Sequence, residues 1–257
     1  MAMKAIGYMG LALALAFPAS GEAAELRHRT DYSIALAGLP IARASFSTVM
    51  NSRRYTISGD IQSAGLADLV TTISAKTSVS GTLGRDRLHA DNYLLDYTNG
   101  KRQRLYEVDF RNGNVVSTAI RPQPKRDPDS WIPVSARDLR AVLDPISGLI
   151  FPAKSRICPQ TLPIYDGESR MDLVLSSKGE KPFSTKGFAG DTLVCGVRYV
   201  PRSGYRKGRK DIDYLRGSKA MEIWFAKAEA VNVYAPVYVK IPTQYGTLTI
   251  SAVRFGG

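Results

Sequence analysis

The cysteines and histidines are the residues whose chemistry is easiest to assign. Cys158 and Cys195 lie 37 positions apart, whereas redox-active thiols usually stand two residues apart near a helix N-terminus. His28 and His89 are remote from each other and from both cysteines, so neither a zinc site nor a histidine-dependent triad is favoured. The spacing favours a structural disulfide over a redox pair, on the condition that the chain reaches an oxidising compartment.

Other catalytic patterns are equally weak. The sequence has no Gly-x-Ser-x-Gly motif, and Ser74-Ala75-Lys76 is one residue too short for a Ser-x-x-Lys nucleophile. Asp166, Glu168 and Asp172 stand near a glycine, where carboxylates more often form turns than act as a glycosidase pair. We therefore expect a protein that is not an enzyme, without a metal site or a cofactor.

The first 23 residues have the three-part layout of a secretory signal peptide. Lys4 supplies a positive charge, residues 5–17 are apolar and uncharged, and residues 18–23 are mostly small. The alternative is a membrane anchor, but this apolar run is shorter than the roughly 20 residues of a spanning helix. We expect cleavage after Ala23 and export to the periplasm, where Cys158 and Cys195 form a disulfide worth about 4 kcal/mol.

Basic residues dominate the charge balance. The chain has 35 Lys and Arg against 23 Asp and Glu, a net charge of +12, and residues 202–219 carry seven of the cations. Glycines at 204, 208 and 217 suggest a flexible loop there. An exported protein has no access to nucleic acid, so the expected partners are anionic membrane surfaces or acidic proteins. The alternative is a solvated loop without a partner. The residues predicted to contact an anionic surface are Arg202, Arg206, Lys207, Arg209 and Lys210.

Aromatic residues are frequent on the expected strands, among 13 Tyr, 8 Phe and 2 Trp in the chain. They could line the concave face of a curved sheet and hold an acyl chain or a peptide. They could equally fill an ordinary core. The candidates for concave-face lining are Tyr93, Tyr97, Tyr106, Phe110, Trp224 and Tyr238.

Alternation of apolar and polar residues predicts antiparallel strands along most of the chain. Asn99-Gly100 and Asn112-Gly113 suit two-residue hairpin turns. The type of the segment 66–79 is left open by its mixed pattern. The expected strands cover residues 32–36, 41–49, 54–61, 93–98, 101–110, 114–120, 167–176, 192–200, 220–226, 237–241 and 247–255.

A proline-rich loop over residues 121–133 interrupts the strands, and one helix is expected after it. Ser135 is a suitable N-cap, Leu139 and Leu143 belong to an apolar stripe, and Asp144-Pro145 would end the helix. The absence of alternating helices and strands excludes a parallel α/β architecture. We expect one mainly β domain over residues 24–257, with a strongly curved antiparallel sheet (open barrel or β-spiral) and one or two short helices.

Several short motifs together resemble a known family. They are Tyr32 with Gly38 and Ala42, Asp144-Pro145-Ile146-Ser147, Tyr165-Asp166-Gly167-Glu168-Ser169-Arg170, Cys195 with Tyr199-Val200-Pro201, and Pro236-Val237 with Tyr245-Gly246. In this order they resemble the exported Gram-negative proteins of domain-of-unknown-function family thirty-one-oh-eight. The resemblance implies a periplasmic protein with a curved β-sheet, similar to envelope-integrity proteins and open-barrel lipoprotein carriers. It implies no catalytic residue.

The leading hypothesis is a non-catalytic cell-envelope protein that contributes to envelope integrity. Its concave face would bind an apolar or amphipathic partner, namely a lipid, a lipoprotein or a peptide, while the basic segment faces anionic lipid. The alternatives are a protein-protein interaction scaffold, whose interior is filled by its own helix or by a partner chain, and an envelope hydrolase. The sequence leaves the oligomeric state open.

Overall fold

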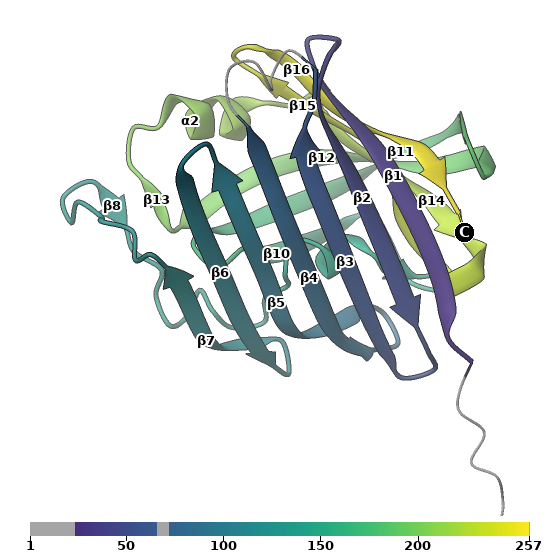
Figure 1. Cartoon of the computed structure of the whole chain (residues 1–257), viewed down its shortest axis with the longest axis horizontal. Coiled ribbons are helices and arrows are strands. Elements are labelled where there is room, and N and C mark those ends of the chain that lie inside the picture. The colour runs from purple at the N-terminus through teal and green to yellow at the C-terminus, as the bar shows by residue number, and fades with distance from the viewer. Residues whose placement is uncertain (1–23, 66–71, 257) are drawn as a thin grey trace, which may run out of the picture.

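The computed structural model describes residues 24–65 and 72–256, and the expected signal peptide and part of the ambiguous segment 66–79 lie outside these ranges. The first half of the chain forms a meander of seven strands (Figure 1). These strands are β1 (Leu26–Leu36), β2 (Leu39–Met50), β3 (Arg54–Ser63), β4 (Ile73–Leu83), β5 (Leu88–Asn99), β6 (Arg102–Arg111) and β7 (Asn114–Arg121).

The second half contributes the remaining strands and the short helices. The long strands are β10 (Gln160–Tyr165), β11 (Arg170–Thr185), β12 (Phe188–Ser203), β14 (Met221–Ala228), β15 (Val233–Thr243) and β16 (Gly246–Phe255). The short elements are β8 (Trp131–Ile132), β9 (Phe151–Pro152), β13 (Tyr205–Arg206), the α-helix α2 (Lys210–Gly217), and the 3-10 turns η1 (Ser147–Leu149) and η2 (Glu229–Val231). No helix in the described residues is long and apolar enough to cross a membrane.

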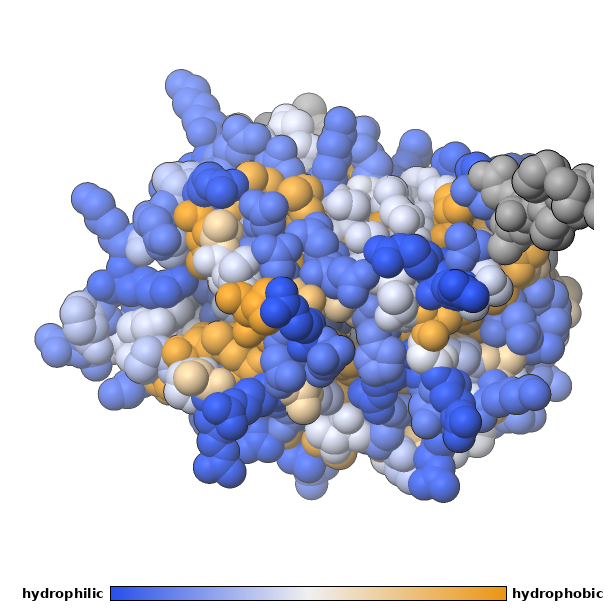
Figure 2. Space-filling model, turned by 90° about the horizontal axis from the view of Figure 1, so that it is seen from below, coloured by the Kyte–Doolittle hydropathy of each residue, from blue (hydrophilic) through white to orange (hydrophobic). Residues whose placement is uncertain are grey.

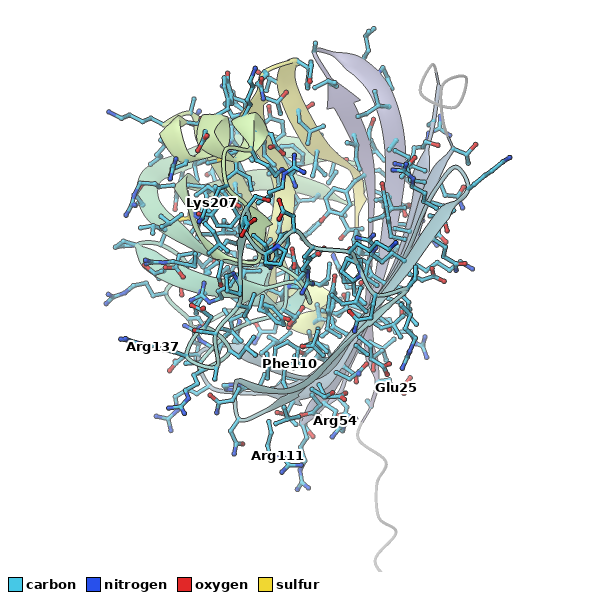
Figure 3. The ribbon with its side chains drawn as sticks, turned by 90° about the vertical axis from the view of Figure 1, so that its left-hand side faces the viewer. Glu25, Arg54, Phe110, Arg111, Arg137 and Lys207 are labelled. Carbon is cyan, nitrogen blue, oxygen red and sulfur yellow. A yellow bond between two sulfur atoms is a disulfide. The ribbon has the colours of Figure 1, made fainter. Side chains whose placement is uncertain are left out.

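One antiparallel sheet contains all the long strands. Its order runs β10-β11-β12-β14-β15-β16-β1-β2-β3-β4-β5-β6-β7, so the first strand pairs with the last strand in the middle of the sheet. The sheet curls until its two ends face each other, as the view from the side shows (Figure 3). This confirms the predicted curved antiparallel sheet, and the Asn99-Gly100 and Asn112-Gly113 turns connect the strands that they were expected to connect.

A short stretch of chain bridges the two edges of the sheet near one end. The amide of Val115 on β7 donates to the carbonyl of Leu139 (2.9 Å), and the amide of Val142 donates to Gly113 (2.7 Å). On the other side, Leu143 donates to Pro163 of β10 (2.8 Å) and accepts from Tyr165 (2.9 Å). The barrel is therefore nearly closed at this end, although β7 and β10 do not pair directly.

Residues 144–150, named here the interior segment, run inside the curled sheet. The buried carboxylate of Asp144 accepts hydrogen bonds from the amides of Ile146 and Ser147 (2.8 Å each) and from the Ser147 hydroxyl. Tyr55 of β3 donates to Ser147 Oγ (2.9 Å), which ties the segment to the sheet. Because the polar groups of this turn satisfy one another, they tolerate a buried position.

The interior segment separates two hydrophobic cores. The larger core joins β2–β7 to β14–β16 and includes Tyr93, Phe110 and Phe255. The second, named here the disulfide core, lies among β10, β11, β12 and β14 and includes Leu162, Cys195 and Phe225. Ile146 and Ile150 pack against the first core, whereas Leu149 and Phe151 belong to the second.

The helix predicted from Ser135 to Leu143 was wrong. Ser135 and Asp138 do form one capped turn, in which the Ser135 amide donates to Asp138 Oδ2 (2.9 Å). Ala141 then adopts a positive φ of 50°, and residues 139–143 pair with strand edges instead. Tertiary strand pairing therefore overrides the local helical pattern.

The flexible loop predicted for the basic segment was also wrong. Arg206 lies on β13, which pairs with β8, and residues 210–217 form the α-helix α2. Ile212 of this helix is buried. The segment is thus an ordered part of the fold.

Candidate ligand-binding site

An apolar cavity of about 250 Å³ lies between the concave face of five adjacent strands and the interior segment. The lining residues are His28, Thr30, Tyr32 and Ile34 on β1; Ala44, Phe46 and Thr48 on β2; Ile57 and Ile61 on β3; Pro145, Ile146, Leu149 and Ile150 on the interior segment; Val231, Val233, Ala235, Pro236 and Val239 on η2 and β15; and Ile250 on β16. No lining residue carries a carboxylate, ammonium or guanidinium group, and the imidazole of His28 is the one basic group among them.

The period of a β-strand explains this lining. Every second residue of a strand faces the same side, and β1 contributes residues 28, 30, 32 and 34 while β2 contributes 44, 46 and 48. Four such positions on β1 span roughly 20 Å at about 3.3 Å per residue. The cavity is therefore elongated along the strands.

Small side chains keep the space open. Ala44 and Ala235 fill little of it, and Gly59 on β3 lets the ring of Phe46 lie directly against its backbone. A Cβ at residue 59 would meet Phe46 Cε1 at 2.4 Å. Tyr32 links β1 to β15, because its hydroxyl donates to the carbonyl of Pro236 (2.6 Å).

One end of the cavity is polar but uncharged. His28, Thr30 and Thr48 are all buried there, and His28 Nε2 lies 3.1 Å from Thr30 Oγ1. The His28 ring packs edge-on against Phe255, with the ring centroids 4.5 Å apart. Burial lowers the pKa of His28, which favours the neutral imidazole at neutral pH.

His28 and Phe255 also border a surface cleft of about 530 Å³ at this end. The cleft contains Glu180, Asp191 and Glu229, whereas its one cation, Lys227, is already paired with Glu229 (2.7 Å). Seen from below, this end of the molecule exposes apolar residues in separate patches between hydrophilic side chains (Figure 2). The polar end of the cavity thus adjoins an acidic surface.

None of the six residues predicted to line the concave face lines this cavity. Tyr93 and Phe110 are buried in the larger core, and Figure 3 shows Phe110 between the two walls of the sheet. Tyr97 and Tyr106 border a surface cleft beside Arg102 and Arg104.

Trp224 and Tyr238 form a separate aromatic cluster. Their rings lie 4.9 Å apart between centroids, Phe183 of the long β11–β12 hairpin contacts Trp224, and the Lys181 ammonium lies 4.9 Å from the Trp224 ring. Apart from His28, Tyr32 and Phe46, the lining residues that sequence reasoning missed are small or aliphatic ones, which look like any other strand residue until the register is known.

The five predicted surface cations differ in their partners. Arg202 pairs with the buried Asp172, and Arg209 pairs with Asp211. For Arg206, Lys207 and Lys210, no ion pair occurs with any described residue. Figure 3 shows Lys207 below α2 at the side of the molecule.

Arg206 and Arg209 belong to a surface cleft of about 750 Å³. Three further cations line this cleft, together with four carboxylates: Arg104, Lys125 and Arg126 against Asp127, Asp166, Glu168 and Asp211. Glu168 lies 3.4 Å from Arg126 and 3.9 Å from Arg104. The cleft is therefore a mixed-charge surface and not a purely basic one.

Cys158 and Cys195 form the predicted disulfide, which joins β12 to the loop before β10. Cys195 is fully buried in the disulfide core, where it cannot meet a substrate. Within residues 24–65 and 72–256, no group of three His, Cys, Asp or Glu side chains is arranged to hold a metal ion.

The fold and the cavity define a class of protein in which a curled antiparallel sheet encloses an apolar space. The chain belongs to the family described as "Protein of unknown function (DUF3108)", whose model matches residues 31–253. A crystallised beta-barrel-like protein of the domain of unknown function DUF1849 from Brucella abortus is similar in structure, with a TM-score of 0.49 and 8% sequence identity over 91% of this chain and 98% of that chain. No curated protein matches the sequence.

Proposed function

We propose that the protein is a non-catalytic periplasmic protein of the cell envelope that holds an acyl chain of a lipid or lipoprotein in its apolar cavity. The observation that carries the proposal is the elongated cavity of about 250 Å³ with an almost wholly apolar lining. Apolar cavities of even about 150 Å³ stay dry and bind small apolar molecules. The signal-like N-terminus and the disulfide support a periplasmic location.

Energetics favour an occupant. The side chains that line this space lack van der Waals partners on the side that faces it, so they forgo the dispersion attraction that close packing would give. A chain of methylene groups restores the missing contacts without having to bury a charge.

The surroundings narrow the kind of ligand. The interior segment occupies part of the concave face, so the remaining space suits one narrow chain and not a folded partner. A chain that leaves past His28 meets Glu180, Asp191 and Glu229. That acidic surface repels a phosphate, whereas it favours a hydroxyl or ammonium head group, or the carboxyl group of a fatty acid in its protonated form.

The test is binding of cis-parinaric acid, a fatty acid that becomes fluorescent in apolar surroundings. Ala44→Leu places a larger side chain in the cavity, and we expect it to weaken binding at least about tenfold, or 1.4 kcal/mol. Unfolding without ligand should change little, because the new side chain enters empty space.

Ala226→Leu is the matched control, because Ala226 is fully buried in the larger core but does not line the cavity. Overpacking should destabilise this variant by about 1–3 kcal/mol, yet it should still bind the fatty acid. Equal binding by the wild type and Ala44→Leu would refute the proposal, as would native mass spectra of the periplasmic protein that show no bound lipid.

A further inference from the structure

The two edges of the sheet are protected to different degrees. β10 carries Pro163, and its edge is paired with Leu143 through two backbone hydrogen bonds. β7 is paired on its outer side only at its beginning, by Leu139 and Val142. Beyond Val115, residues 116–121 have no backbone partner on that side among the described residues.

The sequence of this open edge lacks the usual safeguards. Natural edge strands are shielded by charges, prolines or bulges because unpaired amides and carbonyls recruit other strands. Residues 114–120 read Asn-Val-Val-Ser-Thr-Ala-Ile, without a charge, a proline or a glycine, and a charge and a proline come only at the end of the strand, at Arg121 and Pro122. The only irregularity is a register shift opposite Asp109 and Phe110, and Val116 remains 54% exposed.

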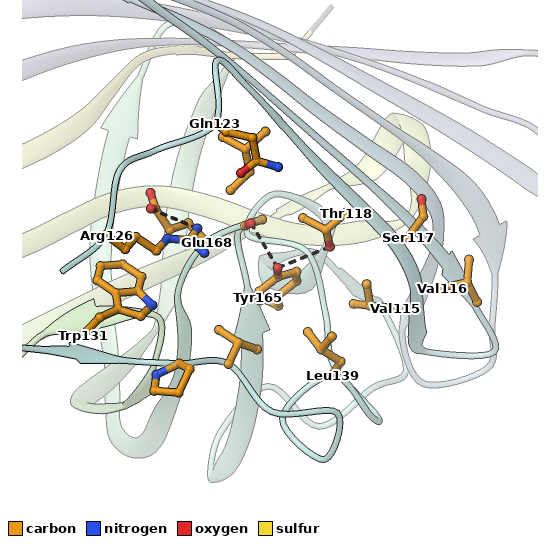
Figure 4. Close-up of a pocket in the computed structure, with 14 residues that line it drawn as sticks. Val115, Val116, Ser117, Thr118, Gln123, Arg126, Trp131, Leu139, Tyr165 and Glu168 are labelled. Carbon is orange, nitrogen blue, oxygen red and sulfur yellow. Dashed lines mark hydrogen bonds and ion pairs between the residues drawn. The ribbon is translucent and has the colours of Figure 1, made fainter. Parts of the chain in front are cut away.

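A groove runs beside this edge (Figure 4). It has a volume of about 430 Å³, and its opposite wall contains Trp131, Val134 and Leu139. Tyr165 reaches across its floor, with its hydroxyl 3.3 Å from Thr118 Oγ1. The groove is thus bounded on both sides, and it continues the line along which residues 139–142 already pair with β7.

We propose that the open edge of β7 and this groove are a strand-addition site for an extended segment of an acidic partner protein. A row of unpaired backbone groups is complemented by another extended backbone. The wall at Trp131 and Val134 leaves room beside β7 for one inserted strand. An edge strand of a second copy would arrive with the rest of its own fold, and this wall would stand in its way.

The positive net charge of the chain favours an acidic partner over a second copy of the same chain. The chain carries +12 overall, so two copies repel each other while an acidic protein is attracted. Arg121 ends β7, and Lys125 and Arg126 follow it. Arg121 and Arg126 already pair with Glu107 and Glu168, whereas Lys125 has no ion pair among the described residues. A partner segment with carboxylates at that end would meet these cations.

The probe is a labelled, acetylated peptide of alternating Val and Thr that ends in two Glu residues. With the peptide at about ten times its Kd, amide hydrogen exchange of residues 116–121 should slow roughly tenfold, while β10 is unaffected. The same peptide with N-methyl groups on alternate amides should not bind, because it cannot complete the ladder.

Val116→Glu places on the edge a charge of the same sign as the partner and should weaken peptide binding about fivefold or more. Val253→Glu on β16 is its control, because Val253 is 52% exposed and lies on an interior strand. Unchanged exchange at residues 116–121, or equal losses in both variants, would overturn the proposal. Protection of this edge that grows with protein concentration in the absence of peptide would assign it to self-association instead. The fatty-acid assay is independent of all these outcomes.

Discussion

The disulfide core and the cavity wall are both made of alternating residues on antiparallel strands, yet they use space in opposite ways. In the disulfide core, Leu162, Cys195 and Phe225 are wholly buried, and the rings of Phe151 and Phe225 meet at 5.3 Å. In the cavity wall, Ala44 and Ala235 leave about 250 Å³ unfilled. The comparison indicates that close packing in one half of the sheet stabilises the fold. The other half can therefore leave part of its interior unfilled.

The largest expected effect is loss of packing in the disulfide core. Phe225→Ala should destabilise the protein by about 3–5 kcal/mol. Phe46→Ala should cost less, because the Phe46 ring already borders empty space. Urea unfolding of both variants measures the contrast, and equal costs would mean that the two regions do not differ in packing.

Loss of the disulfide comes next. Cys195→Ser should lower the free energy of unfolding by about 2–5 kcal/mol, and should leave fatty-acid binding intact because Cys195 lies outside the cavity lining. Calorimetry and the binding assay on the same sample check both expectations. Detection of two free thiols in the exported wild-type protein would contradict the premise.

The contributions of two buried carboxyl groups to the stability of the protein should change in opposite directions as pH rises. Burial raises the pKa of Asp144 on the interior segment. The folded protein therefore holds this proton more tightly than the unfolded chain does, so the contribution of Asp144 to stability declines as pH rises above the range of an exposed aspartate.

Asp172, between β11 and β12, shows the opposite balance. Burial opposes its ionisation, but hydrogen bonds and charges from Arg170 and Arg202 hold its pKa below the ordinary value. Its contribution is present above that ordinary value and is lost as pH falls. We expect the stability of Asp144→Asn relative to the wild type to rise, and that of Asp172→Asn to fall, as pH rises from about 3 to 7. The difference in Tm between each variant and the wild type measures this. Parallel trends would contradict these assignments.

The smallest effect concerns the surface of the disulfide half. Replacing the unpaired Arg206, Lys207 and Lys210 by Gln should weaken sedimentation with anionic vesicles by up to about 1 kcal/mol per cation at low salt. Replacing Arg202 and Arg209, which already have carboxylate partners, should matter less. Equal binding of all variants would return the basic segment to the role of an ordinary solvated surface.

Local signals predicted much of the sheet, because turn chemistry and alternation act over a few residues. Asn99-Gly100 and Asn112-Gly113 define hairpins without help from the rest of the chain. The helix expected after Ser135 failed because residues 139–143 pair with β7 and β10, which are remote in space until the sheet curls. Similarly, α2 depends on burial of Ile212, and its sequence alone resembled a charged loop.

The candidate site was beyond local reasoning for a related reason. A cavity is defined by what several strands leave empty, so Ala44 and Ala235 carry no signal until the register places them on one concave face. The aromatic residues were more conspicuous, but Tyr93 and Phe110 serve the core. The disulfide, in contrast, needed only a count of cysteines and an inferred compartment.

The pairing of β1 with β16 in the middle of the sheet has a consequence for the order of folding. The concave wall of the cavity combines strands from both ends of the chain, and contacts between distant residues form slowly. As the chain folds, β1 lacks one neighbour until the C-terminal residues have joined the sheet, so the apolar cavity is completed after the hairpins on either side. A chain that stops before Gly246 would retain the Cys158–Cys195 half but lack the strand that joins the two ends.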